Sequence, residues 1–84
     1  MSLPAEPVTL SVEQIGELNQ KLADLRHDIN NRISVILAST ELLRRRPEIA
    51  ERMLATLAEQ PPKILELMTQ FSQDLETALH IKRP

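Results

Sequence analysis

Polar residues suited to chemistry are concentrated at one place in the chain, where Asp24, His27, Asp28, Asn30 and Asn31 lie close together in sequence. A neutral imidazole in water offers a nitrogen lone pair that can act as a nucleophile. Asp and Asn are weak helix formers because their side chains compete for backbone hydrogen bonds, and Lys or Glu would stabilise a helix better at these positions. Either this is an ordinary solvated helix face, or helix stability is given up here for chemistry.

The residues around this cluster predict one long amphipathic helix at about 11–45. Ser11 followed by Gln14 forms a capping box, which is typical of a helix start. Residues 1–10 show no periodicity, and we expect a flexible lead-in there. Apolar residues then recur every three or four positions, with a small shift in register after Ile29. They are Ile15, Leu18, Leu22, Leu25, Ile29, Ile33, Ile36 and Leu43.

A second helix is predicted at about 47–80. The three arginines at 44–46 suit a helix C-terminus and Pro47 suits the first turn of a new helix, so the chain should turn there. The apolar spacing continues across Pro61 and Pro62 without a slip, which favours a kink in one helix, with a break into two helices as the alternative. The apolar positions are Ala50, Leu54, Leu57, Pro61, Ile64, Met68, Phe71, Leu75 and Ala78.

The fold class predicted from these two helices is an all-α antiparallel hairpin at 11–80, followed by a short tail at 81–84. Two long helices joined by a loop of a few residues must pack antiparallel. Each helix has an apolar stripe wide enough for more than one neighbour, and a lone pair would leave half of each stripe in water. We therefore expect a homodimer, in which two hairpins form a four-helix bundle.

The direction of the His27 side chain follows from a rotation of about 100° per residue along a helix. His27 lies about 200° from both Leu25 and Ile29, so the ring should point into water, opposite the apolar stripe. Asp24 and Asn31, close to one turn away on either side, should be its nearest polar neighbours.

The composition excludes several classes of site. The chain has 84 residues, one Gly, no Cys, and Phe71 as its one Phe, Tyr or Trp residue, which excludes glycine-rich phosphate loops, thiolate metal sites and disulfide frameworks. A net charge of −2 without base-stacking aromatics argues against nucleic acid as a partner. Neither a membrane-spanning run nor a signal peptide is recognisable, so we expect a cytoplasmic protein.

The segment HDINNRISVILASTELL at 27–43 resembles the phosphoacceptor box of two-component sensor histidine kinases. The matching features are a His-acidic-x-x-Asn/Thr pattern, aliphatic residues at Ile33 and Ile36, and Glu-Leu-Leu at 41–43. The likeness extends more loosely over 11–80, because the dimerisation and histidine-phosphotransfer domain of that family is a helical hairpin that dimerises into a four-helix bundle.

The resemblance implies a role for each polar residue of the box. His27 would be the phosphoacceptor, which takes the γ-phosphoryl group of ATP on Nε2 and passes it to an aspartate of a response-regulator receiver domain. Asp28 would act as acid or base at Nδ1, and Asn31 would position water when the domain dephosphorylates its regulator. Arg32 departs from the family pattern, in which many members carry proline, and this bears on a helix kink rather than on the chemistry.

The chain lacks the asparagine and glycine-rich boxes of a kinase ATP-binding domain. ATP and Mg²⁺ should therefore bind to a separate domain, in cis or in trans, and the chain itself should hold no cofactor. Three explanations stay open: an excised piece of a larger sensor kinase, a stand-alone phosphotransfer protein, and a non-catalytic dimerisation or adaptor module that has lost phosphotransfer. No enzymatic activity is assigned to the chain alone.

Other notable residues have ordinary structural explanations. His80 suits a helix C-terminus, and its distance in sequence from His27 argues against a shared metal site. The arginines at 44–46 are typical of a last helical turn, with contact to an acidic regulator surface as the less favoured alternative. Met53 and Met68 are predicted to fill the core.

Overall fold

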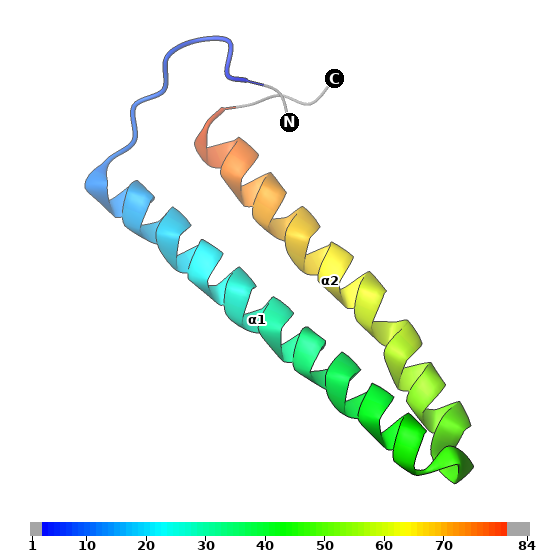
Figure 1. The fold of residues 1–84 in the computed structure, drawn as a ribbon. Helices are drawn as coiled ribbons and strands as arrows, with labels where there is room; N and C mark the ends of the chain where they lie inside the picture. The colour runs from blue at the N-terminus through cyan, green and yellow to red at the C-terminus, as the bar shows by residue number, and fades with distance from the viewer. Residues whose placement is uncertain (1–2, 81–84) are drawn as a thin grey trace.

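The structure is a computed structural model that describes residues 3–80, so the expected tail at 81–84 and the start of the lead-in lie outside the described residues. Helix α1 spans Val12–Arg45, a 3₁₀ turn η1 spans Pro47–Ile49, and helix α2 spans Ala50–Ala78. Figure 1 shows α1 and α2 running antiparallel and side by side, joined at one end by η1. The predicted all-helical hairpin is confirmed, with no strand in the described range.

Helix α1 begins and ends at residues whose side chains or backbone satisfy its free polar groups. Ser11 Oγ accepts a hydrogen bond from the Gln14 backbone N–H at 3.1 Å, and Gln14 Oε1 accepts from the Ser11 N–H at 2.8 Å. The predicted capping box is therefore confirmed. At the other end, the Arg46 N–H donates to the Leu42 carbonyl at 2.7 Å. Pro47 then opens η1, at a position where a missing amide hydrogen is tolerated.

Helix α2 starts slightly later than expected and continues further than its prolines suggest. Residues Pro47–Ile49 form a 3₁₀ turn, so the regular α-helix begins at Ala50. It runs through Pro61 and Pro62 to Ala78 without interruption, so the alternative of a break into two helices is wrong. His80, just after the helix, has a φ of 55°, the left-handed conformation that often ends a helix.

The two helices pack along one seam, which we call the interhelix seam. Most of its residues recur at intervals of three or four, as in coiled coils. On α1 the seam comprises Leu18, Leu25, Ile29, Arg32, Ile36, Ser39 and Leu43, and on α2 it comprises Met53, Leu57, Gln60, Ile64, Leu67, Phe71, Leu75 and Ala78. Arg32 lies in this seam, and Ile33 is exposed, so Ile33 belongs to the part of the wide apolar stripe that a single hairpin leaves in water.

A second group of apolar residues, which we call the apolar face, is left uncovered. It consists of Ile15, Leu22, Ile33 and Leu37 on α1 with Leu54, Leu65 and Met68 on α2, and all seven are exposed. On each helix the apolar face is rotated about the helix axis by roughly 70–100° from the seam. Viewed from the N-terminus of each helix, the rotation has the same direction. Equal rotation in an antiparallel pair places both stripes on one side of the hairpin.

The hairpin is a single layer without an enclosed core. Its extents are 57 × 28 × 12 Å, and 12 Å is about the thickness of one helix. No apolar side chain among residues 3–80 is buried, whereas Ser39 and Gln60 of the seam are. Compact domains normally bury apolar residues between at least two layers. This hairpin therefore offers a large surface for a further layer.

Candidate functional site

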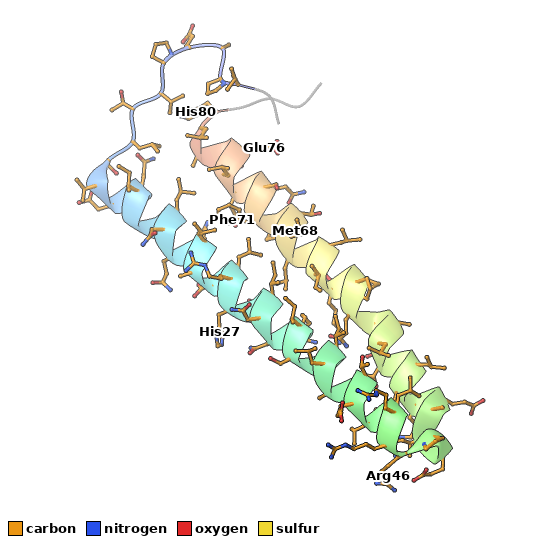
Figure 2. All side chains as sticks on the ribbon, viewed as in Figure 1. His27, Arg46, Met68, Phe71, Glu76 and His80 are labelled. Carbon is orange, nitrogen blue, oxygen red and sulfur yellow. The ribbon has the colours of Figure 1, made fainter. Side chains whose placement is uncertain are left out.

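His27 lies near the middle of α1 and is exposed, as predicted. Figure 2 shows its ring pointing away from α2. By the helical rotation it also lies about 80–140° from the apolar residues of α1 that form the apolar face. A partner covering that face would therefore leave the imidazole open to water and to other molecules.

Asn31 is the residue that the structure brings to His27. Asn31 Nδ2 lies 3.4 Å from His27 Nε2, a long hydrogen bond between side chains one turn apart. An amide nitrogen can only donate, so Nε2 accepts and carries a lone pair in this arrangement. Asp24, the other predicted neighbour, instead accepts a hydrogen bond from Gln20 Nε2 at 2.9 Å.

Asp28 faces a different direction from His27. It is half-buried and turned about 100° from its neighbour in sequence. In the part of the chain that the structure describes, no hydrogen bond or ion pair joins Asp28 to His27. Asp28 instead lines a groove of about 490 Å³ between the two helices, which we call the polar groove. Its polar lining is Asp28, Asn31, Arg32, Lys63, Glu66 and Gln70.

The polar groove carries charges of both signs. Arg32 and Lys63 provide cations, and Asp28 and Glu66 provide anions. Asn31 both lines the groove and contacts His27, so it joins the imidazole to the groove. The groove can therefore present hydrogen-bond donors and acceptors to a polar partner beside the ring.

The α2 side of the groove was not predicted from the sequence. Lys63, Glu66 and Gln70 follow one another at intervals of three and four, so they share one face of α2. This spacing could have been used to predict a polar stripe on α2 from the sequence. It does not show which residues of α1 lie opposite.

The arginines at the hairpin tip are paired with carboxylates. Arg44 and Arg45 lie 3.6 and 2.9 Å from Glu41 oxygens. Arg46 Nε donates to Glu48 Oε1 at 2.9 Å, and this hydrogen bond, together with one from the Glu48 backbone, lowers the pKa of the Glu48 carboxyl. These pairings agree with a structural role at the end of α1.

Two further observations concern residues 3–80. No three His, Asp or Glu side chains are grouped in a way that could hold a metal ion, and His80 is at the opposite end of α2 from the tip. Neither helix has a stretch both long and apolar enough to cross a bilayer.

Comparisons of the chain with models of protein families, with curated protein sequences and with solved structures found no match. The interpretation of function therefore depends on the geometry of the site and on the resemblance carried by residues 27–43.

Proposed function

We propose that this chain is the dimerisation and phosphoacceptor domain of a two-component sensor histidine kinase. In this proposal His27 carries a phosphoryl group between ATP and an aspartate of a response-regulator receiver domain, and the domain can also assist removal of phosphate from that regulator. ATP and Mg²⁺ are bound by a separate catalytic domain, in the cytoplasm.

One observation carries the proposal: His27 is exposed on the side of α1 away from both surfaces that packing would cover. Its ring points away from α2, and the apolar face lies elsewhere on the helix. A phosphoacceptor must reach an ATP-binding domain and then a receiver domain, so it needs such access. The polar groove beside it offers a surface for either partner.

The exposed area of the chain supports a homodimer. A compact monomer of 9.6 kDa exposes about 5,100 Å². This chain exposes 6661 Å². The excess of about 1,600 Å², part of which belongs to the extended residues before α1, is comparable with the area that one subunit buries in an obligate dimer. Pairing two apolar faces would give the four-helix bundle.

The proposed chemistry assigns separate tasks to the polar side chains. The Nε2 lone pair of His27 attacks the γ-phosphorus, and the bond to the leaving ADP oxygen breaks as the N–P bond forms. The attack leaves the ring cationic with its proton on Nδ1, and the Asp28 carboxylate, after a change of rotamer, stabilises this charge and then accepts that proton. The long contact from Asn31 to Nε2 is weak enough to be displaced by the incoming phosphorus.

The test uses the two histidines of the chain as a matched pair. The purified protein is incubated with γ-labelled ATP, Mg²⁺ and separately produced ATP-binding domains of several histidine kinases, and in parallel with several phosphorylated receiver domains. We expect an acid-labile, base-stable label that His27→Ala removes and His80→Ala retains. Label that survives in His27→Ala would contradict the proposed site.

A second candidate function is a non-catalytic dimerisation or adaptor module. It is favoured by the orientation of Asp28, which lines the groove rather than contacting His27. In this case the apolar face is the functional surface and the imidazole is an ordinary solvated residue. Absence of label with every competent donor, in a protein that dimerises normally, would support this candidate.

A further inference from the structure

Two consecutive prolines lie inside α2, at Pro61 and Pro62. Neither has an amide hydrogen, so the carbonyls of Leu57 and Ala58, four residues earlier, lose their usual helical partners. Each ring also crowds the carbonyl four residues before it. Because these two main-chain hydrogen bonds are already missing, α2 can bend at this point without breaking them. Sharp helix bends occur at such positions.

The residue directly before the prolines forms a hydrogen bond to α1. Gln60 is only 2% exposed, and its Oε1 accepts a hydrogen bond from Arg32 Nη1 at 3.4 Å. Its Nε2 donates to the Thr56 carbonyl at 2.8 Å. Both ends of the buried amide are therefore used, one within α2 and one across the interhelix seam.

The part of α2 that lines the polar groove lies entirely after the two prolines. The α1 wall comes from Asp28, Asn31 and Arg32, whereas the α2 wall comes entirely from residues after the prolines, including Lys63 and Gln70. Bending at the prolines would therefore move one wall of the groove against the other, while the hairpin tip stayed in place.

We propose that α2 has a hinge at Pro61 and Pro62, that the Arg32–Gln60 hydrogen bond fixes the residue directly before this hinge against α1 and so limits how far it opens, and that hinge opening changes the width of the polar groove. This proposal does not depend on phosphorylation of His27. It therefore stands or falls separately from the proposed function.

The chain has no cysteine, so pairs of spin labels can be attached to introduced cysteines without background. One pair at the exposed residues Glu17 and Gln73 reports the free ends of the helices, and a second pair at the exposed Ala38 and Ala55 reports the tip. Labelled protein is diluted with excess unlabelled protein, and distances are measured by double electron–electron resonance. We expect a distance distribution roughly twice as wide at the free ends as at the tip.

Three variants separate a hinge from simple fraying of the helix ends. The double variant Pro61→Ala, Pro62→Ala should fold, because Ala is the best helix former, and should narrow the free-end distribution to the width of the tip pair. Arg32→Met, which keeps an unbranched apolar stem, should widen it. Arg45→Met is the matched control, because it breaks an ion pair within α1 rather than across the seam, and should change nothing.

Distance distributions of equal width at the two ends of the unmodified hairpin would overturn the hinge proposal. So would a free-end distribution whose width does not change in the double proline variant. If Arg32→Met behaves as Arg45→Met does, the Arg32–Gln60 bond does not hold the hinge, and that part of the proposal is wrong.

Discussion

Asn31 donates its side-chain amide to Nε2 of His27, one turn earlier on the same helix, at 3.4 Å. Because an amide nitrogen cannot accept a hydrogen bond, the neutral ring in this arrangement has its proton on Nδ1 and a lone pair on Nε2. The nitrogen proposed as the nucleophile is thus the one that faces the Asn31 side-chain amide.

Asn31→Ala should shift the neutral His27 ring toward the tautomer with the proton on Nε2, because the donor to that nitrogen is lost. The tautomer ratio can be measured from the ¹⁵N shifts of the labelled imidazole. Asn30→Ala, on a neighbouring exposed position, is the control and should leave the ratio unchanged. Both exposed substitutions should alter the free energy of unfolding by no more than about 0.5 kcal/mol. An identical ratio in both variants would argue against the Asn31 contact.

Asp28→Asn should abolish labelling of His27 while leaving the oligomeric state intact, because the resemblance implies that Asp28 acts as acid or base at Nδ1 of His27. Asp24→Asn is the matched control, because Asp24 is also a carboxylate near the ring but is bonded to Gln20. Labelling and sedimentation are measured on the same preparations. If Asp24→Asn removes the label and Asp28→Asn does not, the acid or base is Asp24 and the assignment to Asp28 is wrong.

Leu65→Glu should weaken the proposed homodimer by about tenfold or more in Kd, because it would place an unpaired charge in a buried interface. Leu65 is 63% exposed in the single hairpin and belongs to the apolar face. Gln73→Glu introduces the same charge at an exposed position outside that face and should have little effect. Sedimentation equilibrium measures both. A stable folded monomer of the unmodified chain at micromolar concentration would contradict the dimer.

Gln60→Ala should lower the free energy of unfolding by about 1–3 kcal/mol, because it removes a buried amide whose two ends are hydrogen-bonded. Urea unfolding should be compared at one fixed protein concentration, since association changes apparent stability. Gln70→Ala is the control: Gln70 donates to Asp74 at 3.1 Å on the exposed surface, and its loss should have a much smaller effect. Equal effects would show that burial of Gln60 is unimportant.

The Glu48 carboxyl should titrate below its ordinary range, because Arg46 donates a hydrogen bond to its charged form. A pKa lowered by folding contributes stability above the unfolded pKa, and this contribution is lost as the pH falls through the folded pKa. The carboxyl ¹³C shift measured against pH gives the value directly. Arg46→Met should return the pKa toward its ordinary value, whereas Arg45→Met should not.

The features predicted best are those that depend on neighbours in sequence. The capping box at Ser11 requires only Gln14 three residues later, and the turn near Pro47 requires only the fixed φ and missing amide of proline. The outward direction of His27 depends on the rotation of a single helix. Each of these is decided by local geometry, so the amino-acid sequence contains the necessary information.

The features missed depend on how one helix is rotated against the other. A stripe of apolar residues does not show which members face α2 and which face away, so the place of Arg32 in the seam and of Ile33 outside it could not be predicted. The position of Asp28 in the polar groove has the same cause. Lys63 and Glu66, which line the groove with it, come from the other helix, and the phase between the two helices follows from packing along their whole length.

The layer of two helices is only 12 Å thick, so solvent reaches the backbone from both sides. A protease would find no region of the isolated hairpin shielded by a core, and degradation would follow the population of locally opened forms. The lifetime of the chain in a cell should therefore depend on its abundance. Copies that quickly bind a partner over the apolar face would persist, and copies that remain monomeric would be degraded.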